Sequence, residues 1–147
     1  MQLIDLIYKT RLYARDNNSY MFSDTMIKTF INEGIDRVAQ YKVFSKTPHL
    51  EDRTDELKCI PGPYHYMLAL FAASRCFDTD ERFYEGTEKR NEFESLLNDL
   101  LSEIQAGNLT IVDGNGNDVE DGSVYTDHVR DVYFNTHGDG NDDTLLS

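Results

Sequence analysis

Long apolar runs, cysteines and basic residues are all scarce in this 147-residue chain. No stretch approaches the roughly 18 uncharged apolar residues of a transmembrane helix, so we expect no membrane-spanning segment. The two cysteines, Cys59 and Cys76, form no CxxC motif and no Cys/His pair at metal-binding spacing, which favours two free thiols over a disulfide. The opening MQLIDLIYKTR lacks the basic leader and apolar core of a secretory signal, and we expect none there.

Acidic residues outnumber basic ones by 27 to 14, which gives a formal net charge of −13. Phosphate repels a chain this acidic, so nucleic-acid binding through bulk charge is disfavoured. The excess is uneven: residues 1–107 contain 18 acidic and 13 basic residues, a net charge of −5, whereas residues 108–147 contain nine and one, a net charge of −8. Nine Tyr and eight Phe need burial. The sequence therefore predicts a folded body over 1–107 and an acidic C-terminal arm over 108–147.

The body has the apolar periodicity of α-helices. Helices are predicted at 3–15, 23–39, 63–76 and 81–106. In the first of them the apolar stripe comprises Leu3, Ile4, Ile7, Tyr8, Arg11 and Leu12. The predicted fold is all-α: a small bundle of about four helices, followed by an extended arm.

Local signals refine the other three helices. Ser23 is placed to cap the second helix, where Gly34 on the apolar face indicates close packing against a neighbour, with a local kink as the alternative. Pro63 suits the first position of the third helix, which is apolar almost all round and is therefore either central or shared with another subunit. Asp78 and Glu81 have the spacing of a capping box for the fourth helix.

Two regions lack a helical period. Residues 45–58 predict a surface loop with a short extended piece at 57–60. In the arm, a β-like run at 109–112 and a turn at 113–117 leave a short β-hairpin within 109–126 as an alternative to an arm that is extended throughout. Because an isolated hairpin is marginal in water, the arm either stays mobile or orders on another surface. Its apolar patch consists of Val129, Val132, Tyr133 and Phe134.

Motifs that carry catalysis are missing from the sequence. There is no GxxxxGK[ST] phosphate loop, no GxGxxG and no GxSxG, and none of the four histidines pairs at metal-binding spacing. A calcium-loop start at 113–117 fails because Asp118 stands where glycine is required and Val124 where a glutamate is required. The carboxylates at helical spacing in the fourth helix predict a solvated face rather than a di-iron site, since no Glu-x-x-His pair accompanies them. These are Glu81, Glu85, Glu88 and Glu92. We expect no catalytic site, no cofactor and no metal, hence no enzyme.

The order of these signals resembles the head–tail connector proteins (adaptor or head-completion proteins) of tailed bacteriophages. The resemblance depends on three segments: a first helix in LIDLIYKTRLYARD, a Ser-Asp capped helix in YMFSDTMIKTFINEGIDRVAQY and a proline-started helix in LKCIPGPYHYMLALFAASRCF. An acidic turn, a long last helix and an extended tail complete the pattern. The resemblance covers residues 1–107, and the arm is also of the family kind.

This resemblance implies a structural adaptor of the phage neck. In that family, copies form a ring, commonly of twelve, that docks under the portal protein, extends the DNA channel for genome ejection and gives the tail or the next neck protein a platform. DNA passes through without specific binding, no membrane is involved, and the protein is located in the virion neck after assembly in the host cytoplasm. The implied portal-binding anchors are Val129, Val132, Tyr133 and Phe134. The implied subunit interface comprises Tyr64, Leu70, Ala73, Phe93 and Leu97.

Two other classes of function remain as alternatives. An acidic phage-encoded regulatory protein, which mimics DNA or inhibits a host factor, needs carboxylates arrayed on its folded surface, whereas most of the excess charge here is in the arm. A small helical metalloenzyme needs paired Glu and His ligands on facing helices, and the sequence offers none. The adaptor is therefore the favoured prediction.

Overall fold

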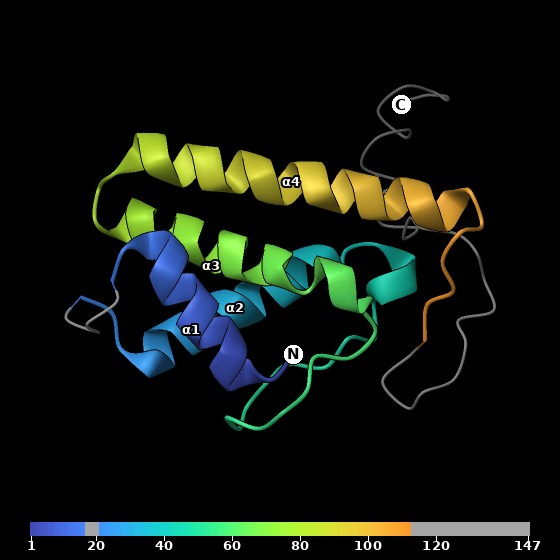
Figure 1. Cartoon of the computed structure of the whole chain (residues 1–147), viewed down its shortest axis with the longest axis horizontal. Coiled ribbons are helices and arrows are strands. Elements are labelled where there is room, and N and C mark those ends of the chain that lie inside the picture. The colour runs from blue at the N-terminus through green and yellow to red at the C-terminus, as the bar shows by residue number, and fades with distance from the viewer. Residues whose placement is uncertain (17–20, 113–147) are drawn as a thin grey trace, which may run out of the picture.

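Four helices form the body of the protein in the computed structural model, which describes residues 1–16 and 21–112 (Figure 1). The α-helices are α1 (Leu3–Ala14), α2 (Asp24–Val38), α3 (Tyr66–Thr79) and α4 (Phe83–Gln105). Two short 3₁₀ turns lie between α2 and α3, η1 (Lys42–Phe44) and η2 (Gly62–Tyr64). The described residues contain no β-strand, and an isolated antiparallel bridge joins Gln2 to Glu56. The predicted all-α bundle is confirmed.

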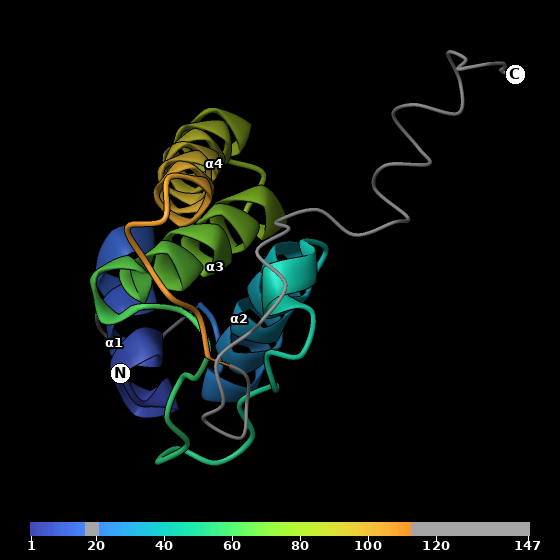
Figure 2. The ribbon, with the colours of Figure 1, turned by 90° about the vertical axis from the view of Figure 1, so that its right-hand side faces the viewer.

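Helix α3 is the centre of the body. Ten of its 14 residues are buried, and it packs against each of the other three helices. Figures 1 and 2 show α4 along one side of α3 and both α1 and α2 on the other. An apolar surface almost all round the helix is what such a position requires. Of the two interpretations left open for this helix, the structure shows the central one.

The contact between α2 and α3 follows two sequence signals. The Ser23 hydroxyl accepts a hydrogen bond of 3.1 Å from the Met26 backbone N–H, which confirms the predicted N-cap of α2. A Cβ atom at Gly34 would lie 3.1 Å from Phe71 Cδ1 and 3.2 Å from Leu68 Cδ2. Because α2 is continuous through Gly34, this glycine serves close packing against α3 and does not mark a kink.

The turn from α3 to α4 corrects one prediction. Helix α3 continues through Asp78, and Glu81 then reverses the chain with a positive φ of 59°. Helix α4 begins at Phe83 without a side-chain cap. The Asp78 carboxylate instead faces α4 beside Gly86 and lies 3.8 Å from the Arg90 guanidinium. The predicted capping box is therefore wrong, because Asp78 still belongs to the preceding helix.

Side chains fasten the long connection between α2 and α3. The Asn32 side chain of α2 bonds both to the backbone N–H and to the carbonyl of Leu50, each at 2.9 Å. The Asp55 carboxylate accepts two backbone N–H bonds from within the loop, at 2.8 and 2.9 Å. The predicted extended piece at 57–60 forms no strand. Individual hydrogen bonds hold this loop in place, and no periodic pattern in the sequence predicts them.

The body continues beyond the end of α4. Ile111 is buried in the main core, and Leu109 packs against it. The residues from 109 to 111 therefore lie on the body, although the arm is predicted to begin at 108. The remainder of the proposed hairpin, from 113 onward, lies outside the described residues. Within the described part of the chain, no helix is both long enough and apolar enough to cross a membrane.

Candidate interaction surface

The structure places most of the predicted subunit-interface residues inside a single body. Only Tyr64 is partly exposed. The other four are at most 2% exposed: Leu70, Ala73, Phe93 and Leu97. Their surroundings are this chain's own side chains, so in this fold they form its core and not a surface. The arm anchors at 129 and 132–134 lie outside the described residues.

Other apolar side chains are exposed in their place. Among the described residues, five of the exposed large apolar side chains lie where α1 leads into α2 and where α3 leads into α4, at one end of the bundle (Figure 1). We call this surface the connection end; it comprises Leu12, Met21, Met26, Phe83 and Tyr84. Phe83 is 62% exposed and Tyr84 is 74% exposed, although they are adjacent. Exposed apolar side chains that gather in one region are typical of interaction sites.

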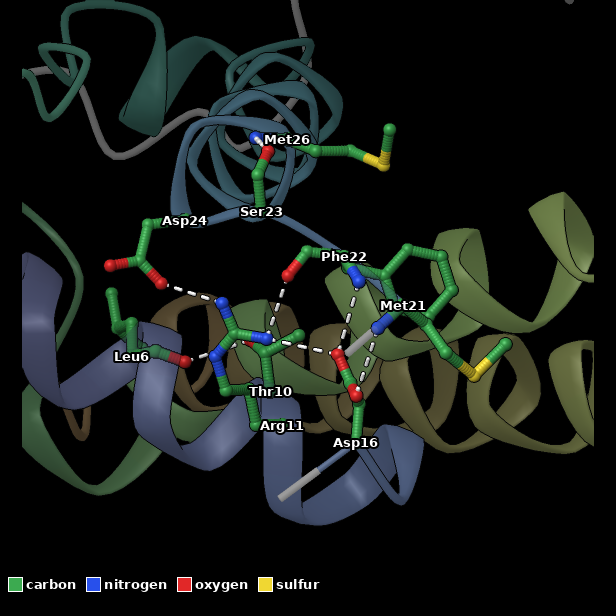
Figure 3. Close-up of polar contacts among 9 residues, drawn as sticks. All are labelled: Leu6, Thr10, Arg11, Asp16, Met21, Phe22, Ser23, Asp24 and Met26. Atoms are coloured by element: carbon green, nitrogen blue, oxygen red, sulfur yellow. Dashed lines mark hydrogen bonds and ion pairs between the residues drawn. The ribbon is translucent and has the colours of Figure 1, made fainter. Parts of the chain in front are cut away.

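A buried ion-pair network shapes the connection end (Figure 3). The Arg11 guanidinium donates to the Asp16 carboxylate at 2.9 Å, to the Phe22 carbonyl at 2.8 Å and to the Asp24 carboxylate at 2.6 Å. Asp16 also accepts the backbone N–H groups of Met21 and Phe22, at 3.2 and 3.1 Å. Arg11 and Asp16 are both buried. The network ties the last turn of α1 to the start of α2 and so fixes where Met21 lies.

Sequence periodicity predicted neither this network nor the outer face of α1. Arg11, Tyr8 and Leu12 all belong to the predicted apolar stripe, yet Arg11 is buried in ion pairs while Tyr8 and Leu12 are exposed. The buried face of α1 is rotated toward Thr10. The Thr10 hydroxyl donates a hydrogen bond of 2.7 Å to the Leu6 carbonyl, so its burial leaves no hydrogen-bonding group without a partner. A charged residue within an apolar stripe was the available signal for a buried ion pair.

A hollow of about 560 Å³ lies beside α1. We call it the α1 hollow; it is lined by Met1, Asp5, Tyr8, Lys9, Leu12, Gly62 and His65. Tyr8 and Leu12 are one turn apart, and so are Asp5 and Lys9. Asp5 accepts the Gln2 backbone N–H at 3.1 Å, whereas the described residues provide no carboxylate within ion-pair distance of Lys9. The hollow therefore offers apolar surface with one charge of each sign.

His65 forms the buried side of this hollow. Its Nε2 lies 2.6 Å from the Ile60 carbonyl, and its Nδ1 lies 3.0 Å from the Met1 amino group. Because a carbonyl only accepts, Nε2 carries the proton and Nδ1 accepts from the ammonium. Burial lowers the pKa of His65, although the Ile60 carbonyl acts in the opposite direction. His65 is therefore a neutral side chain with both ring nitrogens occupied by the fold.

A second hollow, of about 580 Å³, lies between α3 and α4. We call it the α3–α4 hollow; it is lined by Tyr66, Leu70, Glu88, Asn91, Glu92, Ser95 and Leu96. Glu88 and Glu92 are exposed, as the prediction of a solvated acidic face requires. Glu92 pairs with Lys89 at 3.3 Å. The wall of this hollow is therefore acidic, unlike that of the α1 hollow.

Several carboxylates elsewhere on the body pair with basic side chains. Glu33 of α2 pairs with Arg75 of α3 at 2.9 Å, and Arg37 of α2 pairs with Glu94 of α4 at 2.8 Å. In the residues that the structure describes, no group of three His, Cys, Asp or Glu side chains could hold a metal ion. Both cysteines are buried thiols, which confirms the predicted absence of a disulfide between them. The calcium-like segment at 113–117 lies outside the described residues.

Comparison of the chain with protein-family models, with curated proteins and with solved structures found no match. A proposal for its function rests on the sequence pattern and on the surfaces described above.

Proposed function

We propose that this chain is a structural adaptor in the neck of a tailed phage. In this proposal, copies form a ring under the portal protein, extend the DNA channel and support the tail or the next neck protein. The observation that carries the proposal is the connection end. The described body leaves these five apolar side chains exposed, and contact with a partner would remove that unfavourable exposure.

The proposed subunit contact is the connection end and not the four buried residues named above. In a closed ring of more than two copies, each copy meets its two neighbours through two different surfaces. Such an interface is called heterologous. Phe83 and Tyr84 supply the largest exposed apolar area at this end, and aromatic side chains are enriched in the centres of interfaces. The ring of twelve copies and the binding of the arm to the portal follow from the sequence resemblance.

Charge also supports an adaptor over a DNA mimic. A mimic of DNA presents free carboxylates at the spacing of phosphates, whereas Glu33 and Glu94 of this body are neutralised by arginines. The body is mildly acidic, with a net charge of −5 over residues 1–107, and an acidic channel wall does not retain phosphate as DNA passes. Both features suit a protein that surrounds DNA without binding it.

The proposal is tested by mixing the full chain with the portal ring encoded in the same phage genome. Light scattering should show a monomer or weak oligomer alone, and electron microscopy should show a second ring stacked on the portal in the mixture. A chain that neither binds the portal nor forms a ring on it would overturn the proposal.

Removal of residues 125–147 gives a second prediction. These residues follow the last described helix in the sequence, so the far-UV circular dichroism of the shortened chain should keep the helical signal of the full chain. Docking on the portal should be lost, because the four arm anchors are removed with them. A large fall in helical signal would show instead that the arm is part of the core.

A further inference from the structure

We propose that residues 129–134 of this chain bind in the α1 hollow of the same chain. The hollow presents two apolar side chains that the fold leaves exposed, Tyr8 at 64% and Leu12 at 46%. Its volume of about 560 Å³ is within the usual range for occupied binding pockets, roughly 300–1,000 Å³. An occupant that brings apolar side chains would cover both.

The arm is long enough to reach this hollow. The described chain ends at Val112, and the first anchor, Val129, follows 17 residues later. An extended chain spans about 3.3 Å per residue, so this linker reaches roughly 55 Å, well over the length of α4 at about 1.5 Å per residue. After α4 the chain runs back past α3 to the level at which α1 begins (Figures 1 and 2). The undescribed residues therefore follow from a point level with the start of α1, the helix that supplies most of the lining of the hollow.

The sequence of the segment complements the hollow. Val129, Val132 and Tyr133 have the i, i+3, i+4 spacing of anchors that a short helix places in an apolar groove. Between them stand Arg130 and Asp131, one charge of each sign. The hollow also carries one of each, Asp5 and Lys9, one turn apart on α1. Each charge of the segment thus has an opposite charge available on the rim.

Charge selects the α1 hollow over the α3–α4 hollow. The arm has a net charge of −8, and the α3–α4 hollow places Glu88 and Glu92 on its wall. Like charges that meet across a contact are unfavourable, whereas Lys9 offers a cation with no carboxylate within ion-pair distance in the described residues. The two hollows are nearly equal in volume, so this difference in charge decides between them.

A bound arm has a consequence that rests on the proposed function. The anchors that would occupy the α1 hollow are those that the portal would bind, so the two contacts exclude each other. The apparent affinity for the portal then falls in proportion to the fraction of chains whose arm is free. The intramolecular contact holds the arm in the free protein, and the portal displaces it.

The contact is tested on the full chain with a nitroxide attached at Asn135→Cys, next to the segment. The native Cys59 and Cys76 are buried and should take up no label, which the parent chain without the new cysteine verifies. The nitroxide should broaden the backbone amide signals of residues 5–12 much more than those of residues 88–96. Broadening centred on 88–96, or no selective broadening, would overturn the proposal.

Matched substitutions and a mixed sample make the test specific. Tyr8→Asp, in the α1 hollow but outside the connection end, should abolish the broadening of α1, whereas Ser95→Asp, the same charge change in the α3–α4 hollow, should leave it intact. A mixture of isotope-labelled chain without nitroxide and unlabelled chain with nitroxide should show no broadening; broadening there would assign the contact to a second copy. Portal docking is measured separately, so an adaptor that lacks this contact would still stack on the portal.

Discussion

The interior around α3 and the connection end contain the same kinds of side chain but differ in what covers them. Phe71 and Phe93 are buried and meet edge to face, with ring centroids 5.1 Å apart. Phe83 and Tyr84 stand at the start of α4, more than half exposed. Buried apolar area stabilises the folded chain, whereas exposed area contributes to stability only when a partner covers it. The comparison separates the residues that make the fold from those available for association.

The largest expected effect is in the interior. Phe93→Ala removes a fully buried ring from between α3 and α4 and should lower the free energy of unfolding by about 3–5 kcal/mol, because a cavity remains. Urea denaturation followed by circular dichroism measures this loss. A loss below about 1 kcal/mol would show that the site collapses and that the interior is not closely packed there.

The Arg11 network links the two regions, and breaking it should have a slightly smaller effect. Arg11→Met leaves the buried Asp16 carboxylate without its guanidinium, and removal of one partner of a buried pair costs about 3 kcal/mol or more. Asp24→Asn is the control, because Asp24 is exposed and its pair should contribute less than about 1 kcal/mol. Equal losses in the two variants, again from urea denaturation, would contradict the account of the network.

The smallest effect is a dependence on pH. Because the pKa of His65 is lowered in the folded chain, the unfolded chain takes up a proton first as pH falls below its ordinary value of about 6.5. The contribution of His65 is therefore fully present above that pH and declines below it. Unfolding free energies measured at pH 7.5 and pH 5.5 should differ more for the parent than for His65→Gln. An equal or steeper dependence in the variant would refute the assignment.

Sequence was sufficient where one local rule decides the outcome. The N-cap at Ser23 can be predicted from the three residues that follow it. Glycine at position 34 on an apolar face indicates that another helix packs closely there. It failed where the outcome depends on a distant partner. In sequence Asp78 has the pattern of a helix cap, but in the structure its carboxylate lies beside Arg90 and Gly86 of α4. The position of Leu50 depends on the side chain of Asn32, 18 residues away.

The interaction surface was harder to predict than the fold. Periodicity shows that α1 and α4 have apolar faces, but not how much of each face the other helices cover. Tyr8 and Leu12 therefore belong to the predicted apolar stripe and Leu97 and Phe93 to the predicted interface, whereas the folded body exposes the first two and buries the other two. The exposure of an apolar residue depends on how the helices pack in three dimensions, and the sequence pattern of one helix does not contain that information.

The central claim is that the connection end serves association and not folding. Its most direct test is sedimentation of the portal mixture with two variants of α4, Tyr84→Asp at the connection end and Thr87→Asp, which is also exposed and lies three residues further on. The free energies of unfolding of both variants should lie within about 0.5 kcal/mol of the parent's, because both are surface changes. The account predicts that Thr87→Asp assembles on the portal like the parent and that Tyr84→Asp does not. Equal assembly of the two variants would contradict it.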